Sequence, residues 1–264
     1  MFCEEFFLIF SFLFLLSCSK DDDKNTTSVV TDGGGTVVQS TVLPKKINVE
    51  SKYAPYTLIF DYDGKKIKQC VVVGYNKEVY TYDGDNIVRK EVLLTDNTLL
   101  NKHEYKYINN KLEYYLAVIY NTPSGNITNK TVFTYNADNS ISYVTYRVKY
   151  NGDLDPLCNG KLFFLNENLI RHEINDGSST RTLEYSYDDK NNPFKNILGF
   201  DKLLSFEDSD YVSKNNIVEY KSTFKSNYNN ITDVKKYTYK YDLNGYPVEK
   251  KSDSSDSKKY IFSY

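Results

Sequence analysis

The chain has 264 residues, and its 33 lysine and arginine residues nearly balance its 35 aspartate and glutamate residues. A nucleic-acid-binding protein would carry a basic excess or a basic stripe, whereas the two signs are interspersed along this chain. The aromatic material consists of 26 tyrosine and 15 phenylalanine residues, with no tryptophan. This composition argues against a nucleic-acid partner and favours β-strands, in which tyrosine is enriched.

The first element along the chain is an apolar run over Phe6–Leu16. Its length suits the hydrophobic region of a secretory signal peptide and falls short of the roughly 20 residues that a membrane-spanning helix needs. The run ends in a sequence that resembles the lipobox of bacterial lipoproteins: Leu15, Leu16, Ser17 and Cys18. The resemblance implies that residues 1–17 are a signal peptide and that Cys18 carries a lipid anchor in the membrane.

An acidic triplet follows the cysteine: Asp21, Asp22 and Asp23. It resembles the acidic export signal of surface lipoproteins in the Bacteroidota, and a solvated run of charges is the alternative interpretation. Residues 18–41 are rich in serine, threonine, aspartate and glycine, so they bury too little apolar surface to offset the entropy of ordering. We therefore expect a flexible polar tether and a protein anchored by lipid in the outer membrane, with its domain exposed at the cell surface.

The domain over residues 42–264 repeats one unit, in which an alternating aromatic strand is followed by an Asx or Gly turn and a second alternating strand. The first halves of the unit are Phe60–Gly64, Tyr80–Gly84, Tyr105–Asn110, Phe133–Asn136, Phe163–Asn166, Tyr185–Asp188 and Tyr239–Gly245. The aromatic residues that end these strands, from Tyr62 to Tyr187, are 20 to 29 residues apart. Such spacing fits one hairpin and its connection.

Alternation within the unit predicts how its faces differ. Tyr80 and Tyr82 share one face of a strand and Thr81 lies on the other. This one-sided pattern is typical of antiparallel sheets. We therefore predict an all-β fold, an antiparallel meander of repeated hairpins that forms one large curved sheet, an open barrel or a sandwich. At most one short helix is expected, near residues 194–206, where apolar residues are roughly helix-spaced but Gly199 intervenes.

The repeat resembles the YD-type repeats of large bacterial surface and toxin proteins. It is more similar to a group of Bacteroidota lipoproteins of unknown function, in which a Tyr-x-Tyr-Asp strand end precedes an Asn-Asn-Pro-Phe element. Here that combination runs from Tyr185 to Phe194. The resemblance implies an architecture for most of residues 55–264 and carries no activity with it.

Few residues suggest catalysis or metal binding. The sequence has two histidines, His103 and His172, and ordinary strand positions explain both. It contains no metalloprotease, nucleophile-elbow or phosphate-loop motif. The acidic turns at Asp61–Gly64 and Asp83–Asn86 superficially resemble calcium loops, but they lack the further ligands that calcium needs. We expect hairpin turns there, no metal and no cofactor. Cys70 and Cys158 are either a disulfide or, as we favour, two buried small residues.

The tyrosines suggest one function, ligand binding, because a tyrosine ring stacks on sugars and anchors protein interfaces. The candidate ligand-binding residues are Tyr80, Tyr82, Tyr105, Tyr107, Tyr185 and Tyr187. The alternative is that they fill the core. We expect a non-enzymatic surface module that binds glycan or protein. An open barrel that carries a hydrophobic ligand such as lipid in a pocket of roughly 300–1,000 Å³ is a second hypothesis, and a periplasmic hydrolase that uses a histidine is a third.

Overall fold

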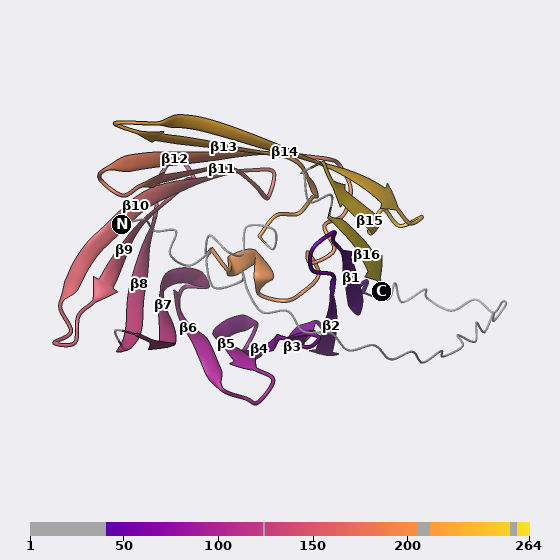
Figure 1. Cartoon of the computed structure of the whole chain (residues 1–264), viewed down its shortest axis with the longest axis horizontal. Coiled ribbons are helices and arrows are strands. Elements are labelled where there is room, and N and C mark those ends of the chain that lie inside the picture. The colour runs from indigo at the N-terminus through magenta and orange to yellow at the C-terminus, as the bar shows by residue number, and fades with distance from the viewer. Residues whose placement is uncertain (1–40, 124, 205–211, 254–257) are drawn as a thin grey trace. The chain divides into compact units, whose positions relative to one another are not determined.

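The computed structural model describes residues 41–123, 125–204, 212–253 and 258–264. The part from Val42 onwards is one compact unit. Its strands are β1 (Lys46–Glu50), β2 (Tyr56–Asp63), β3 (Lys66–Val72), β4 (Asn76–Asp83), β5 (Asn86–Leu94), β6 (Leu99–Ile108), β7 (Lys111–Thr122), β8 (Gly125–Tyr135), β9 (Ile141–Val148), β10 (Leu154–Leu165), β11 (Asn168–Asn175), β12 (Ser179–Tyr187), β13 (Ile217–Ser226), β14 (Asn230–Tyr241), β15 (Pro247–Ser252) and β16 (Lys259–Ser263), with a 3₁₀ turn, η2 (Phe200–Lys202), between β12 and β13. Each strand pairs with the next in chain order, as the ring of strands in Figure 1 shows.

The sheet closes into a barrel. β1 pairs antiparallel with β2 on one side and with β16 on the other, so that Ile47 lies opposite both Leu58 and Phe262. The predicted all-β antiparallel meander is confirmed, and the predicted open sheet, open barrel or sandwich is wrong. Closure removes the two exposed edges that an open meander of sixteen strands would present for pairing with another chain.

The repeat places a β-bulge at the same position in six strand pairs, five of which are hairpins. The register shifts next to the strand-end aromatic, and one extra residue in the return strand is left unpaired, such as Val88 opposite the Thr81–Tyr82 step. The six steps are Asp61–Tyr62, Thr81–Tyr82, Lys106–Tyr107, Phe163–Phe164, Ser186–Tyr187 and Lys240–Tyr241. A bulge bends its strand and increases the local twist. Regularly placed bulges therefore supply the curvature that closure requires.

The hairpin turns confirm the sequence interpretation of the acidic turns. Gly64 and Gly84 have φ values of 60° and 55°, and Asn109 and Asn110 of 49° and 61°. Tight two-residue hairpins need such positive φ angles, which glycine and asparagine tolerate. The supposed calcium-like loops are the turns of the β2–β3 and β4–β5 hairpins.

The aromatic face of the repeat points into the barrel and forms its core. Tyr80, Tyr105 and Tyr185 are buried there with the first apolar residues of the return strands, such as Ile87 and Leu112. Both free cysteines, Cys70 on β3 and Cys158 on β10, are also buried, which agrees with the favoured interpretation of two small buried residues.

Tyrosine hydroxyls at the strand ends satisfy backbone groups at the bulges. In four adjacent strand pairs the hydroxyl donates to the carbonyl of the first bulge residue on the preceding strand: Tyr135 to Leu112 (3.2 Å), Tyr187 to Leu169 (2.6 Å), Tyr239 to Ile217 (2.8 Å) and Tyr264 to Pro247 (2.8 Å). Because a bulge interrupts the ladder, its polar groups need partners from elsewhere. Tyrosine supplies this donor at the four positions, and phenylalanine offers none.

The connection between β12 and β13 lies inside the barrel and closes one end. We call its described residues, 188–204 and 212–216, the inner segment. Ile197, Phe200 and Leu203 are buried in the main core, and the orange ribbon in Figure 1 lies within the ring of strands. The segment also binds the hairpin turns around it, for example through the Lys202 ammonium, which donates to Asn86 and Asn110. The short helix expected near residues 194–206 is therefore reduced to the single 3₁₀ turn η2, in a segment that belongs to the core.

The outer face of the barrel carries ion pairs as well as apolar side chains such as Leu116 and Val118 of β7. Ion pairs there join neighbouring strands at Lys68–Asp61, Lys221–Glu184, Lys236–Glu219, Lys240–Glu249 and Lys259–Glu50. Exposed pairs of this kind contribute little to stability, because water screens the two charges.

Replacing Tyr187 with phenylalanine should lower the free energy of unfolding by about 1–3 kcal/mol, because the carbonyl of Leu169 would lose its donor inside the core. Urea denaturation of the soluble domain measures this. Tyr228, which is 93% exposed, provides the matched control, and Tyr228→Phe should change stability by less than about 0.5 kcal/mol. Equal effects of the two substitutions would contradict the role of the hydroxyl.

Candidate functional site

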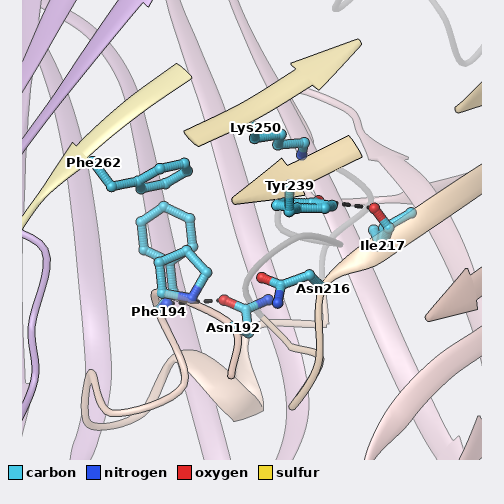
Figure 2. Close-up of a pocket in the computed structure, with 8 residues that line it drawn as sticks. Asn192, Phe194, Asn216, Ile217, Tyr239, Lys250 and Phe262 are labelled. Carbon is cyan, nitrogen blue, oxygen red and sulfur yellow. Dashed lines mark hydrogen bonds between the residues drawn. The ribbon is translucent and has the colours of Figure 1, made fainter. Parts of the chain in front are cut away.

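A small pocket lies inside the barrel, between the inner segment and strands β13 to β16 (Figure 2). Its lining combines apolar rings with amides and one ammonium group: Asn192, Pro193, Phe194, Asn216, Ile217, Tyr239, Lys250 and Phe262. The space free of atoms there is about 310 Å³, open solvent included. Phe194 and Phe262 pack in one cluster at one side of it.

Hydrogen bonds within the inner segment fix the amides of this pocket. The backbone N–H of Phe194 donates to the Asn192 side-chain oxygen at 2.8 Å. The Asn216 amide donates to both carboxylate oxygens of Asp188, at 3.3 and 3.2 Å, and to the carbonyl of Asn191 at 3.2 Å. Asn192 and Asn216 are both buried. The pocket is therefore preorganised, and its shape does not depend on a ligand.

Lys250 brings a positive charge to the pocket from the inner face of β15. Its Nζ lies 4.4 Å from the ring centroid of Tyr237, 5.9 Å from that of Tyr239 and 5.5 Å from that of Tyr260. Ring faces attract a cation at these distances. The pocket thus presents apolar ring faces, two amides and an ammonium group, a set that can hold a small polar group beside an apolar one.

The six tyrosines singled out in the sequence lie on the inner face. Tyr80, Tyr105 and Tyr185 are buried, and Tyr82, Tyr107 and Tyr187 are half-buried around the main core. Burial raises the pKa of Tyr82 to about 12, so its hydroxyl stays a donor, and it binds the carbonyl of Leu198 at 2.9 Å. A ligand would have to enter the barrel to reach these rings, and their binding role stays a prediction.

The two histidines are buried on the inner face and lie on different strands. His172 Nε2 pairs with the Tyr143 hydroxyl at 2.8 Å, and burial lowers the pKa of His172 to about 3. His103 packs between the rings of Tyr105 and Tyr115. Burial and the neighbouring Lys90 hold the pKa of His103 well below its ordinary value. Both imidazoles are therefore neutral at pH 7.

Sequence reasoning missed most of the pocket. Tyr239 belongs to the repeat, and Asn192–Phe194 belongs to the element that carried the family resemblance. Lys250 and Phe262 come from the last two strands, where nothing in the sequence indicated that they would meet the inner segment. Only closure of the barrel brings them to it.

Several further expectations concern residues outside the pocket. Cys18, the lipobox residues and the acidic triplet lie outside the described residues. Among the residues that the structure describes, no group of three or more histidine, cysteine, aspartate or glutamate side chains could hold a metal ion. The same residues contain no helix of the length and hydropathy needed to span a membrane.

Comparison with known proteins identifies the architecture. No protein-family model and no curated protein matches the sequence. The crystal structure of a porin-like protein from Bacteroides vulgatus is similar over 84% of this chain and 98% of that chain, with a TM-score of 0.56 and 16% identity. A porin-like protein from Bacteroides uniformis is similar over 83% and 97%, with a TM-score of 0.50 and 8% identity. The chain therefore shares a porin-like β-barrel fold with these structures.

The buried neutral His172 should make stability depend on pH. Since its pKa is about 6.5 when unfolded and about 3 when folded, protons bind preferentially to the unfolded chain between these values. Stability should therefore be complete above pH 6.5 and fall as the pH decreases toward 3.

Urea unfolding at pH 7.5 and pH 5.0 tests this dependence. His172→Gln should lose less stability between the two pH values than the wild-type protein does, although it starts from a lower value. His103 titrates in the same direction in both proteins and so cancels from the comparison. Identical pH slopes would contradict the burial of a neutral imidazole at this position.

Proposed function

We propose that this protein is a lipid-anchored module whose barrel stands outside the lipid bilayer and binds a glycan or protein at the cell surface. The barrel is the rigid scaffold, Cys18 is the attachment point, and the binding groups lie on the inner face. No catalytic step is part of the proposal.

The outer wall is the observation that carries the proposal. A barrel that crosses a membrane needs an outward apolar band about 25 Å tall, flanked by aromatic girdles. Here the outward positions carry ion pairs between neighbouring strands, such as Lys221–Glu184 and Lys236–Glu219 in the middle of β12 to β14. Placing these charges in hydrocarbon would cost several kcal/mol in total. A barrel with this wall suits water, and so a separate anchor is needed.

The sequence supplies such an anchor, and the barrel begins close to it. Val42, where the tether joins the barrel, accepts a hydrogen bond from Asn196 of the inner segment at 2.9 Å. The compact unit thus begins at the end that the inner segment closes. The far end of the barrel carries the loop between β1 and β2, the loop between β3 and β4 and the other loops on that side. We infer that a ligand approaches from this end.

The pocket chemistry favours a ligand with both polar and apolar parts. Aromatic faces next to amides and an ammonium group are typical of sugar and peptide recognition. The hydrophobic-carrier hypothesis has weaker support, because the cavity of this pocket measures about 30 Å³, far below the range expected for a carrier. The hydrolase hypothesis has weaker support too, since the His172 imidazole is buried in the barrel and pairs with the hydroxyl of Tyr143.

Substituting Cys18 with serine should release the protein from membranes. The signal peptide would lose its lipidation site, and a barrel with a charged outer wall has no other means of attachment. Fractionation of cells followed by immunoblotting should find the wild-type protein in the membrane pellet and Cys18→Ser in the soluble fraction. A variant that stays in the pellet through a carbonate wash, and leaves it only with detergent, would show that the barrel itself is embedded.

The acidic triplet should control surface display. Replacing Asp21, Asp22 and Asp23 with asparagine should leave the protein lipidated but protect it from protease added to intact cells. The wild-type protein should be cleaved under the same conditions, and both should be cleaved after lysis.

Binding is tested separately, with a glycan array and pull-downs by the mature Cys18→Ser protein. The absence of any ligand above background would contradict the binding role.

A further inference from the structure

One side of the outer wall is apolar, in contrast to the ion-paired strands β12 to β14. The outward positions of β7 alternate with Tyr115 and Ala117, which point into the barrel. Strand pairing sets the outward positions of β7, β8 and β9 side by side. Six of them are apolar and half-buried, and we call them the apolar patch: Leu116, Val118, Val132, Val144, Tyr146 and Val148. Contiguous apolar surface of this kind on a soluble protein is often a binding site.

One charged side chain, Lys130 of β8, stands inside the apolar patch. It lies opposite Leu116 on β7 and Tyr146 on β9. Its Nζ is 4.3 Å from the ring centroid of Tyr114, and no carboxylate of the described residues forms an ion pair with it. A charge that is covered without an opposite charge is strongly unfavourable. Whatever covers the patch must therefore bring an acidic group, which the hydrocarbon of a membrane cannot do.

A second copy of the chain carries an acidic group in the required place. Glu104 of β6 lies opposite Leu116, on the side away from Lys130. Neighbouring strands are about 4.8 Å apart, so the two charges lie at about that distance on either side of Leu116. A two-fold axis beside Leu116 exchanges these two sides. Lys130 of one copy then meets Glu104 of the partner subunit, and the reciprocal contact forms as well.

Glu104 can accept this additional partner. Its side chain is 45% exposed on the outer face, where it pairs with Lys102 at 3.1 Å. Because a carboxylate has about four lone-pair sites, it can hold a second ammonium group. An axis beside Lys130 itself would set two lysines against one another. The charges therefore place β7, and not β8, at the centre of the interface.

The same axis suits two anchored copies. An axis parallel to the barrels keeps both of them in one orientation, so that both compact units begin, at Val42, on the same side. Two anchors can then enter one membrane. The interface lies on the lateral wall, and so it leaves the far end of each barrel open to a ligand.

We propose that this protein forms a two-fold dimer through β7, in which Lys130 of each copy pairs with Glu104 of the partner subunit and the apolar patches cover one another around Leu116. The patch measures roughly 300 Å² per copy. Two such surfaces bury less than the roughly 1,200 Å² of a standard stable interface. The dimer is therefore reversible in solution, and anchoring in one membrane strengthens it by raising the effective concentration. The inference goes beyond the proposed binding function and rests on it only for the placement of the outer wall in water.

Sedimentation velocity of the mature Cys18→Ser protein, at micromolar to millimolar concentrations, tests the dimer. The protein should show a concentration-dependent equilibrium between monomer and dimer. Val118→Lys should raise the dissociation constant about tenfold or more, because it adds a charge near the centre of the interface. Val234→Lys is the matched control, since Val234 lies on the outer face of β14 and is 45% exposed. It should leave the dissociation constant unchanged, and circular dichroism should show both variants folded.

Charge reversal tests the pairing across the axis. Lys130→Glu and Glu104→Lys should each raise the dissociation constant about tenfold, because each sets two like charges against one another. The double variant should return to within about threefold of the parent protein. Leu116 separates the two residues within one chain, so only a contact between copies explains such a rescue.

A protein that stays monomeric at every concentration would overturn the proposal, as would equal effects of Val118→Lys and Val234→Lys or a double variant without rescue. Binding of the Cys18→Ser protein to vesicles of phosphatidylethanolamine and phosphatidylglycerol, lost in Val118→Lys, would identify lipid as the cover of the patch and overturn it too. The proposed function fails on other grounds, namely carbonate-resistant retention of Cys18→Ser in cell membranes or the absence of any ligand.

Discussion

The barrel depends on the hydrogen bond between a strand-end tyrosine and the carbonyl of a neighbouring bulge. Bulges supply the curvature that lets sixteen strands close, but each bulge interrupts the ladder inside an apolar core. Four tyrosines supply the missing donors, because their rings fill the core and their hydroxyls reach the carbonyls at the bulges. They are Tyr135, Tyr187, Tyr239 and Tyr264. Burial reinforces the arrangement, since it raises the pKa of Tyr135 and keeps the hydroxyl protonated. The repeated aromatic residue, the bulge and the closure of the barrel thus depend on one another.

The same alternation of residues turns the aromatic rings of the repeat into the barrel. In a membrane barrel apolar residues face outward and polar residues inward. Here the rings face inward around the inner segment, and ion pairs such as Lys259–Glu50 cover the outside. The likeness to porin-like proteins is therefore a likeness of architecture. Function is proposed from the wall and the pocket, and from the anchor that the sequence indicates.

The sequence predicts local structure well and long-range structure poorly. Alternation and Asx-Gly turns predict the strands, the hairpins and the aromatic face, because these depend on neighbouring residues. Closure depends on β1 meeting β16, a contact between residues such as Ile47 and Phe262 more than 200 positions apart, and no local pattern encodes it. The same limit explains why Lys250 was missed at the pocket.

The most direct test of this account asks which face of the barrel meets water in the membrane-anchored protein. Glu184 and Leu183 are neighbours on β12, and their side chains point outward and inward respectively; Leu183 is fully buried. Single cysteines at these positions can be probed on isolated membranes with a membrane-impermeant maleimide, with the wild-type protein as the background for buried Cys70 and Cys158. The account predicts rapid labelling of Glu184→Cys and slow labelling of Leu183→Cys. Protection of Glu184→Cys that detergent removes would place the outer wall in lipid and contradict it.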